Sequence, residues 1–293
     1  MTPYVSVVLG SYNRKKFLRL TIDSIRRELE EFRINGEIIV IDGGSDDGSA
    51  EWLLNQKDII SIFQHNHGLW NGLPVEKRSW GGFMNLGFKC ARGKLICMVS
   101  DDCLLVPGAL KNGIDIIEKY TADGCKIGGA AFYWRDVPGP AKYWVGSLFE
   151  KTYLINQGIF STSALAEAGY VDESRYQFYY ADSDLCLRLN ELGCSILLSD
   201  ESFIEHYSHA NVKQRKSNSL SSEKDKNAFY EKWENKSITI NPFYSKDKAT
   251  IEYEDPYKTY KTFSKAEIFN YYRIKSAIKQ VIKKVFVRDE RGR

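Results

Sequence analysis

The sequence lacks the marks of several protein classes. None of its six cysteines stands in a C-x-x-C pair, which argues against a disulfide scaffold and against a zinc site of the usual spacing. No run of 18 apolar residues occurs, and the chain enters the strand-like segment 4–9 without a basic stretch or a cleavage site. We therefore expect reduced, packed thiols in a cytoplasmic protein, with neither a membrane span nor a secretory signal.

An excess of charge of one sign is also missing. The 41 lysines and arginines nearly balance the 38 aspartates and glutamates, and 43% of the residues are hydrophobic. This composition is that of a globular protein and excludes disorder and collagen-like repeats. Only residues 265–293 are clearly basic, with nine Lys or Arg against three Asp or Glu. A protein built around nucleic acid should carry its basic surface on the folded domain, so we expect no nucleic-acid partner.

Up to about residue 130 the chain alternates short apolar runs with amphipathic stretches. The runs are continuous, as at 38–41, which is typical of strands covered by helices on both faces. This order predicts βαβ units, and hence an α/β fold with a mainly parallel sheet flanked by helices. The expected strands are 5–9, 37–41, 59–63 and 95–99, and the expected helices are 15–32, 47–54, 81–91 and 107–120, the last with Pro107 at its first position.

The second part of the chain is less regular. A helix is expected to open near Asp182, and strands are expected at 195–198 and 203–207. Residues 213–226 are polar and rich in serine, which favours a loop or linker. The predicted divisions are a domain over 1–210, a linker and tyrosine-rich extension over 211–264, and a basic amphipathic helix over 265–293.

Three polar turns follow three of the expected strands, at residues 10–14, 42–48 and 100–103. The ligands of parallel sheets bind beyond the carboxyl ends of the strands. We therefore expect these turns to line one crevice, although about ninety residues separate the first from the last.

Several side chains in or near these turns have both a functional and a structural interpretation. Asp101 and Asp102 either hold a divalent metal with phosphate oxygens or cap the next helix. Asp42 enters a glycine-rich turn that either admits a ligand or simply joins a strand to a helix. Asp182 is an N-cap, a general base, or both. His206, near the end of an expected strand, is either a ligand or a structural residue.

The order of the motifs is more specific than any one of them. Together they resemble the family 2 inverting glycosyltransferases of GT-A fold, which has a Rossmann-like sheet, and the resemblance covers about residues 3–210. A further segment, Tyr170-Val-Asp-Glu173, is similar to the family's Gly-Phe-Asp-Glu and is interpreted as structural capping. The segments that carry the resemblance are Val5-Ser-Val-Val-Leu-Gly-Ser-Tyr-Asn-Arg14, Ile39-Val-Ile-Asp-Gly-Gly-Ser-Asp-Asp-Gly-Ser49, Met84-Asn-Leu-Gly-Phe88, Val99-Ser-Asp-Asp102 and Ala181-Asp-Ser-Asp-Leu-Cys-Leu-Arg188.

The resemblance implies a nucleotide-sugar donor in the crevice, bound by Ser11, Tyr12 and Arg14 of the first motif. Tyr12 would pack on the base, and Asp42 would accept a hydrogen bond from it, which suggests a UDP- or dTDP-sugar. Arg78, in a loop that contains glycine and tryptophan, is either a partner of the diphosphate or a solvated loop residue.

The resemblance also implies a metal, Mn or Mg. The segment 100–102 is similar to the family's D-x-D element, with serine in place of the first aspartate. On that match Asp101 would face the ribose or the sugar, and Asp102 would hold the metal on the diphosphate. His206 lies where many members carry a histidine, and would complete the metal site or contact the diphosphate.

Asp182 matches an acidic position of the family's Glu-Asp-x-Asp pattern and would be the general base of a hexosyltransferase-type reaction. The usual Glu is Ala181 in this chain, so the resemblance does not extend to a contact of that Glu with the acceptor. The acceptor would be a glycan or a lipid-linked sugar, as in cell-surface polysaccharide synthesis. Trp134, Tyr143 and Trp144 either stack on its sugar rings or belong to the core.

The basic segment 265–293 suits an anionic membrane surface, which would make the protein peripheral on the inner face of a membrane. It equally suits packing on the body or on a partner subunit.

Two other functions remain as alternatives. One is a nucleotidyltransferase, whose basic glycine-rich signature this chain lacks. The other is a non-catalytic nucleotide-sugar binding module that scaffolds a membrane assembly.

Overall fold

The computed structural model describes residues 2–66, 68–136, 142–207 and 219–252. Residues 1–252 form one compact unit, which continues past the domain end placed at residue 210 from the sequence. The basic helix expected over 265–293 lies outside the described residues. Within the described ranges, no helix is both long and apolar enough to cross a membrane.

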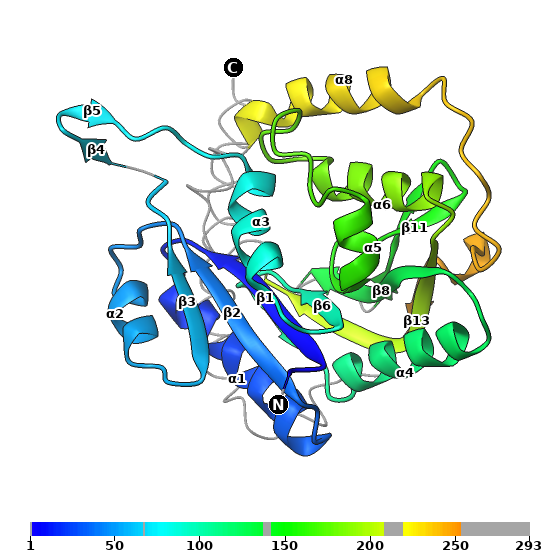
Figure 1. The fold of residues 1–293 in the computed structure, drawn as a ribbon, viewed down its shortest axis with the longest axis horizontal. Coiled ribbons are helices and arrows are strands. Elements are labelled where there is room, and N and C mark those ends of the chain that lie inside the picture. Colours follow the sequence, from blue (N-terminus) through cyan, green and yellow to red (C-terminus); the bar gives the residue numbers. More distant parts are fainter. Residues whose placement is uncertain (1, 67, 137–141, 208–218, 253–293) are drawn as a thin grey trace, which may run out of the picture. The chain divides into compact units, whose positions relative to one another are not determined.

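The described part of the chain is built around a mixed sheet of ten strands (Figure 1). Strands β3, β2, β1 and β6 are parallel neighbours, β12 runs antiparallel between β6 and β8, and β13 is parallel to β8. The sheet consists of β1 (Val5–Ser11), β2 (Gly36–Asp42), β3 (Ile59–Phe63), β6 (Leu95–Met98), β7 (Cys103–Leu105), β8 (Ile127–Asp136), β9 (Lys142–Trp144), β12 (Gly158–Ser161), β13 (Ser195–His206) and β14 (Thr250–Glu252).

Helices cover both faces of this sheet, so the predicted α/β class is confirmed. Apolar residues of α1 (Lys15–Glu31) and α4 (Ala109–Ala122) form one core cluster with β1, β2 and β6. On the other face lies α3 (Trp80–Cys90), where a Cβ on Gly87 would come within 2.6 Å of Val8 and Ile41. This glycine lets the helix approach the sheet closely.

The remaining elements are short or lie beyond the central strands. The hairpins are β4 (Leu69–Trp70) with β5 (Leu73–Pro74), and β10 (Gly146–Leu148) with β11 (Thr152–Leu154). The remaining helices are α2 (Ser49–Leu54), α5 (Thr162–Glu167), α6 (Ala181–Glu191) and α8 (Ser222–Trp233), with 3-10 turns at Ser219–Ser221 and Lys246–Lys248.

Two expected elements differ from the structure. Pro107 was predicted at the first position of a helix, which is wrong, because α4 begins at Ala109 after Gly108 in a left-handed conformation with φ of 90°. The strands expected at 195–198 and 203–207 are a single strand, β13. Its pairing with β8 shifts register between Leu198 and Phe203, so an irregularity of the kind that a β-bulge produces interrupts the apolar pattern.

The segment expected as a linker contributes α8 to the compact unit. Asp225 of this helix is fully buried, and its carboxylate accepts hydrogen bonds from the backbone N–H groups of residues 177–179. The Trp233 indole donates to Asp184 Oδ1 of α6 at 2.8 Å. Helix α8 therefore holds the loop that leads into α6.

A carboxylate of α1 caps α4. Glu28 is 2% exposed, and its two oxygens accept the backbone N–H groups of Gly108 at 2.6 Å and Leu110 at 2.8 Å. Burial raises the pKa of Glu28 from its usual 4.5 to about 7, although the backbone donors act in the opposite direction. Glu28 thus caps the start of α4, which was expected to begin at Pro107.

We expect Glu28→Ala to lower the free energy of unfolding by about 2–4 kcal/mol, because it leaves buried N–H donors without an acceptor. In Glu28→Gln the side chain no longer titrates. Since the folded protein raises the pKa of Glu28, its stabilising contribution relative to Gln is complete below pH 4.5 and falls as pH rises through about 7. Urea unfolding of the wild type and of Glu28→Gln between pH 4 and 8 measures this difference in the free energy of unfolding. A difference that is independent of pH would contradict the raised pKa of Glu28.

Candidate functional site

The three polar turns lie at the carboxyl ends of neighbouring parallel strands, as predicted (Figure 1). In the register of β1 with β2, Ser11 lies opposite Asp42. The Gly43 N–H donates to the Ser11 carbonyl at 2.9 Å, which joins the first two turns. The segment 100–102 follows β6, the strand on the other side of β1. The fold therefore brings together residues that the sequence separates widely.

Asp42 organises its own turn. It is fully buried. Its Oδ1 accepts the N–H groups of Gly44 and Ser45, and its Oδ2 accepts the Ser45 hydroxyl at 2.7 Å. Tyr12 lies against this turn, since a Cβ on Gly43 would come within 3.2 Å of its ring. Burial and the nearby Asp46 and Asp42 raise the pKa of Tyr12. The contact of Asp42 with a base stays a prediction.

The acidic pair is buried and joined by an arginine. Asp101 and Asp102 are 4% and 3% exposed, and Arg14 Nη1 lies 2.8 Å from Asp101 Oδ1 and 2.8 Å from Asp102 Oδ2. Burial raises the pKa of Asp101, with Arg14 opposing it. The alternative in which these aspartates cap a helix is wrong, because Glu28 caps α4. Ser11 is buried next to Asp101.

Two carboxylate oxygens of this pair, Asp101 Oδ2 and Asp102 Oδ1, are buried without a hydrogen-bond partner among the described residues. His206 Nε2 lies 3.6 Å from Asp102 Oδ1, and His206 Nδ1 lies 2.9 Å from Asp136 Oδ1. With Nδ1–H donated to Asp136, Nε2 is directed to the same region as the carboxylate. A carboxylate that orients a histidine in this way is the usual support of a metal ligand.

The donor set at this point suits a divalent cation. One ligand atom from each of Asp102, Cys103 and His206 lies within 4.8 Å of the others. Mg²⁺ and Mn²⁺ prefer oxygen ligands and accept imidazole more readily than thiol. Burial raises the pKa of the Cys103 thiol well above its usual value, which keeps it protonated. The residues that fit an oxygen-preferring metal are therefore Asp102 and His206.

Asp182 lies in the first turn of α6. The helix begins at Ala181 after Tyr180 in a left-handed conformation, so the interpretation of Asp182 as the N-cap is wrong. Its Oδ1 accepts the Ser183 N–H at 2.8 Å, and its Oδ2 accepts Asn156 Nδ2 at 3.0 Å. Its side chain is partly buried. Burial raises its pKa, and these hydrogen bonds act in the opposite direction.

Arg78 is exposed in the loop before α3. Its backbone is fixed, since its N–H donates to Asn66 and its carbonyl accepts from Gln177. Among the described residues, its side chain forms no hydrogen bond or ion pair with Asp101, Asp102 or Asp182. Its contact with a diphosphate stays a prediction.

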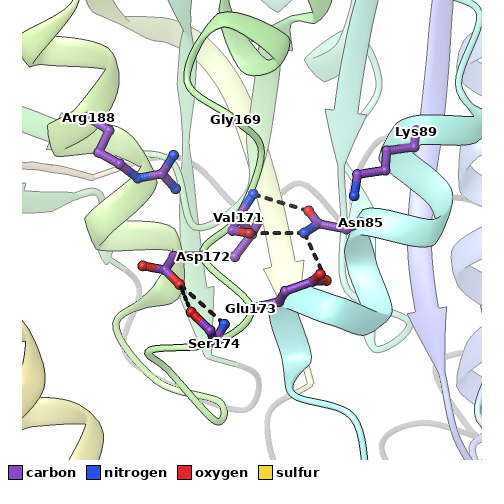
Figure 2. Close-up of a pocket in the computed structure, with 8 residues that line it drawn as sticks. All are labelled: Asn85, Lys89, Gly169, Val171, Asp172, Glu173, Ser174 and Arg188. Atoms are coloured by element: carbon purple, nitrogen blue, oxygen red, sulfur yellow. Dashed lines mark hydrogen bonds between the residues drawn. The ribbon is translucent and has the colours of Figure 1, made fainter.

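A separate pocket of about 410 Å³ lies between α3, α6 and the segment that contains residues 169–174 (Figure 2). Asp172 there accepts the N–H groups of Ser174 and Arg175, and Asn85 bonds both the backbone of Val171 and the Glu173 carboxylate. The interpretation of this segment as structural capping is confirmed. None of the residues that line the pocket belongs to the predicted site.

Three polar residues near the site were not predicted from the sequence. Asp136 contacts His206 because these residues are partners in the pairing of β8 with β13. Asn156 contacts Asp182, and Gln157 contacts Ser100. Each is a single polar residue whose importance depends on tertiary contacts, so no motif or periodicity could have identified it.

The chain is similar to known proteins in sequence. Residues 6–158, more than half of the chain, match the profile of the family described as Glycosyl transferase family 2. An uncharacterized glycosyltransferase of Rickettsia typhi is 30% identical over 118 residues, which are 40% of this chain and 33% of that protein. The putative glycosyltransferase EpsH of Bacillus subtilis is 27% identical over 106 residues, 36% of this chain and 28% of that protein. The chain thus spans a third or less of the length of these relatives.

Solved structures share the fold. The mannosyltransferase PcManGT from Pyrobaculum calidifontis, in complex with GDP-Man and Mn²⁺, gives a TM-score of 0.58 at 15% identity, over 83% of this chain and 68% of that chain. TarS of S. aureus gives a TM-score of 0.50 at 17% identity, over 69% of this chain and 36% of that chain. At these identities the likeness concerns the fold alone.

Proposed function

Since this chain belongs to glycosyl transferase family 2, we propose that it is an inverting, metal-dependent glycosyltransferase. The donor is a UDP- or dTDP-sugar, and the acceptor is a hydroxyl group of a glycan or a lipid-linked sugar in cell-surface polysaccharide synthesis. The single observation that supports this most is the cluster of the buried Asp101 and Asp102 with the partly exposed His206. It presents carboxylate oxygens without a hydrogen-bond partner in the described part of the chain, together with an oriented imidazole, at the carboxyl ends of the parallel strands.

Asp182 performs the proton transfer in this proposal. A sugar hydroxyl is a poor nucleophile at neutral pH, and Asp182 accepts its proton as the oxygen attacks the anomeric carbon. The new bond forms on the face opposite the nucleotide, and the bond from the anomeric carbon to the diphosphate oxygen breaks with its electron pair. A single displacement inverts the anomeric configuration. The partial burial of Asp182 supports the role, because burial raises its pKa and so increases its basicity.

The other residues bind and orient the donor. Tyr12 and Asp42 lie in adjoining turns that suit the base, and Asp101 faces the ribose or the sugar. Asp102 and His206 would hold a Mn or Mg ion, which supplies positive charge to the departing diphosphate when bound. Arg14, Ser11 and Arg78 complete the donor residues of the proposal.

The acceptor side is supported by two tryptophans near His206. The rings of Trp134 and Trp144 lie with centroids 3.8 Å apart, and Trp134 meets the His206 ring edge-on at 5.5 Å. Trp144 is 39% exposed, so it offers a ring to a sugar close to the proposed metal ligands. Tyr143, by contrast, is fully buried, in agreement with its alternative as a core residue.

Membrane association is a further part of the proposal and depends on the sequence of residues 265–293. A basic amphipathic helix there would bring the enzyme to a lipid-linked acceptor on the cytoplasmic face. If deletion of residues 265–293 leaves flotation with anionic liposomes unchanged, membrane association through this segment is excluded.

The test is nucleotide release from a panel of UDP-, dTDP- and GDP-sugars in the presence of Mn, Mg or EDTA. We expect release from a uridine or thymidine donor that requires the metal. Binding of the donor without turnover with any glycan or lipid-linked acceptor would favour the non-catalytic binding module instead. Release of pyrophosphate from a nucleoside triphosphate and a sugar phosphate would favour the nucleotidyltransferase.

A further inference from the structure

We propose that Asn156 and Gln157 are positioning residues, which fix the position of the Asp182 carboxylate relative to the loop of residues 100–102. This inference rests on the proposed role of Asp182 as the base. The two amides lie immediately before β12, between the acidic loop that follows β6 and the first turn of α6.

An unbroken chain of hydrogen bonds connects the loop to the base. The Ser100 N–H donates to Gln157 Oε1 at 2.9 Å, and Gln157 Nε2 donates to the Ser100 hydroxyl at 3.0 Å. Gln157 Nε2 also donates to Asn156 Oδ1 at 3.4 Å, and Asn156 Nδ2 donates to Asp182 Oδ2 at 3.0 Å. Ser100 stands where the D-x-D element has its first aspartate, and here it anchors this chain.

The bonds fix which way each amide points. Gln157 uses both N–H groups of its amide as donors, toward Ser100 and toward Asn156. The Asn156 oxygen must therefore face Gln157, and its nitrogen must face Asp182. A reversed Asn156 would place its oxygen against the carboxylate, which repels it. The amide thus donates to one particular oxygen of Asp182.

The backbone beneath the two amides is held on both sides. Gly158 pairs with Met98 of β6 and Ala131 of β8, and the Gln157 carbonyl accepts the Phe132 N–H at 3.1 Å. A Cβ on Gly158 would come within 2.3 Å of the Ala130 carbonyl oxygen, so the strand fits closely here. Gln157 is 3% exposed. The amides are therefore mounted on the sheet and not on a free loop.

The contact has a measurable consequence for Asp182. Donation from Asn156 favours the charged carboxylate and works against the burial that raises its pKa. The Ser183 N–H has the same effect as Asn156. Among the described residues, the buried Cys186 of α6 interacts electrostatically with Asp182, and burial raises the pKa of its thiol, which is neutral. Removal of the Asn156 amide should therefore raise the pKa of Asp182 further.

The experiment measures the pKa of Asp182 directly, in the full chain labelled with ¹³C at the aspartate carboxyl groups. The resonance of Asp182 is the one lost in Asp182→Asn. In Asn156→Ala we expect its pKa to rise by about one pH unit. In Asn156→Gln, which keeps the amide, we expect a smaller rise. Asn112→Ala removes an amide of α4 that donates to the Glu201 carbonyl and not to Asp182, and it should leave the pKa unchanged.

Isosteric Asn156→Asp replaces the donor by an acceptor and serves if the alanine variant does not fold; it should raise the pKa of Asp182 more than one pH unit. An unchanged pKa in either variant would overturn the inference.

Gln157→Ala should lower kcat about tenfold with the donor KM within about twofold, because the base is no longer held in position while the donor contacts remain. The melting temperature of Gln157→Ala distinguishes this loss of kcat from a loss caused by unfolding.

The titration needs no turnover, so it judges the positioning role separately from the proposed function. If no donor is turned over but the pKa moves as expected, the contact stands and the enzymatic proposal falls. If turnover is found and the pKa of Asp182 does not move, the enzymatic proposal stands and the positioning role falls.

Discussion

Replacing Asp182 by asparagine should reduce transfer by about 10²–10⁴-fold while the protein remains folded, because the variant cannot accept the proton of the attacking hydroxyl. Asparagine retains an oxygen that can accept either the Ser183 N–H or the Asn156 amide. Wild-type activity should rise with pH as Asp182 deprotonates, and since burial raises its pKa this limb lies above the usual aspartate range. The residual activity of Asp182→Asn should lack the limb.

The matched control for this substitution is Asp115→Asn. Asp115 is an exposed residue of α4 that pairs with Lys111, so we expect wild-type turnover and an unchanged pH profile. Melting temperatures of both variants establish that they are folded. Turnover of Asp182→Asn close to that of the wild type would exclude Asp182 as the base.

The second large effect is expected for Asp102→Ala, in which metal-dependent binding of the nucleotide should be lost. Asp102 Oδ1, which has no hydrogen-bond partner among the residues that the structure describes, lies 3.6 Å from His206 Nε2, so the substitution takes away the carboxylate of the proposed metal site. Calorimetric titration with UDP or dTDP, whichever nucleotide the donor panel identifies, should show at least about tenfold tighter binding with Mn than with EDTA in the wild type. The two affinities should be equal in the variant.

Two further variants sharpen this experiment. Removing one partner of a buried charge pair is destabilising by about 3–5 kcal/mol, and Asp102 is paired with Arg14. Asp102→Ala also removes most of the side chain. Asp102→Asn therefore tests the same ligand position with a side chain of equal size. Cys103→Ala removes the thiol that lies beside the proposed ligands. Because Mn and Mg disfavour thiol, its response to Mn should equal that of the wild type. Loss of the response in Cys103→Ala alone would shift the site toward a thiol-binding metal.

Much of the fold was predictable because its signals are local and repeated. The continuous apolar runs of β1 and β2 arise from burial on both faces, and the polar turns after them mark the carboxyl ends. The positions of Tyr12, Asp42 and Asp102 around one edge follow from that pattern. The order of the motifs then specified the family more sharply than any single residue.

The remainder depends on tertiary contacts that leave no pattern in the chain. Glu28 caps a helix that begins eighty-one residues later, so Pro107 was a misleading signal. Helix α8 has a polar, serine-rich start and buries only a few residues, among them Phe229 and Trp233, which made it resemble a linker. Asn156 could be connected with Asp182 only once the strand and the helix were placed side by side.

The attachment of α8 decides where this protein can be divided or recombined. A fragment that ends at residue 158, where the family profile ends, would lack Asp182, and one that ends at 210 would lack α8. The buried Asp184 would then lose both Lys232 and Trp233, two residues after the proposed base. A chimaera that exchanges C-terminal segments between relatives must therefore carry matched partners for Asp184, and the compact unit of residues 1–252 should be transplanted intact.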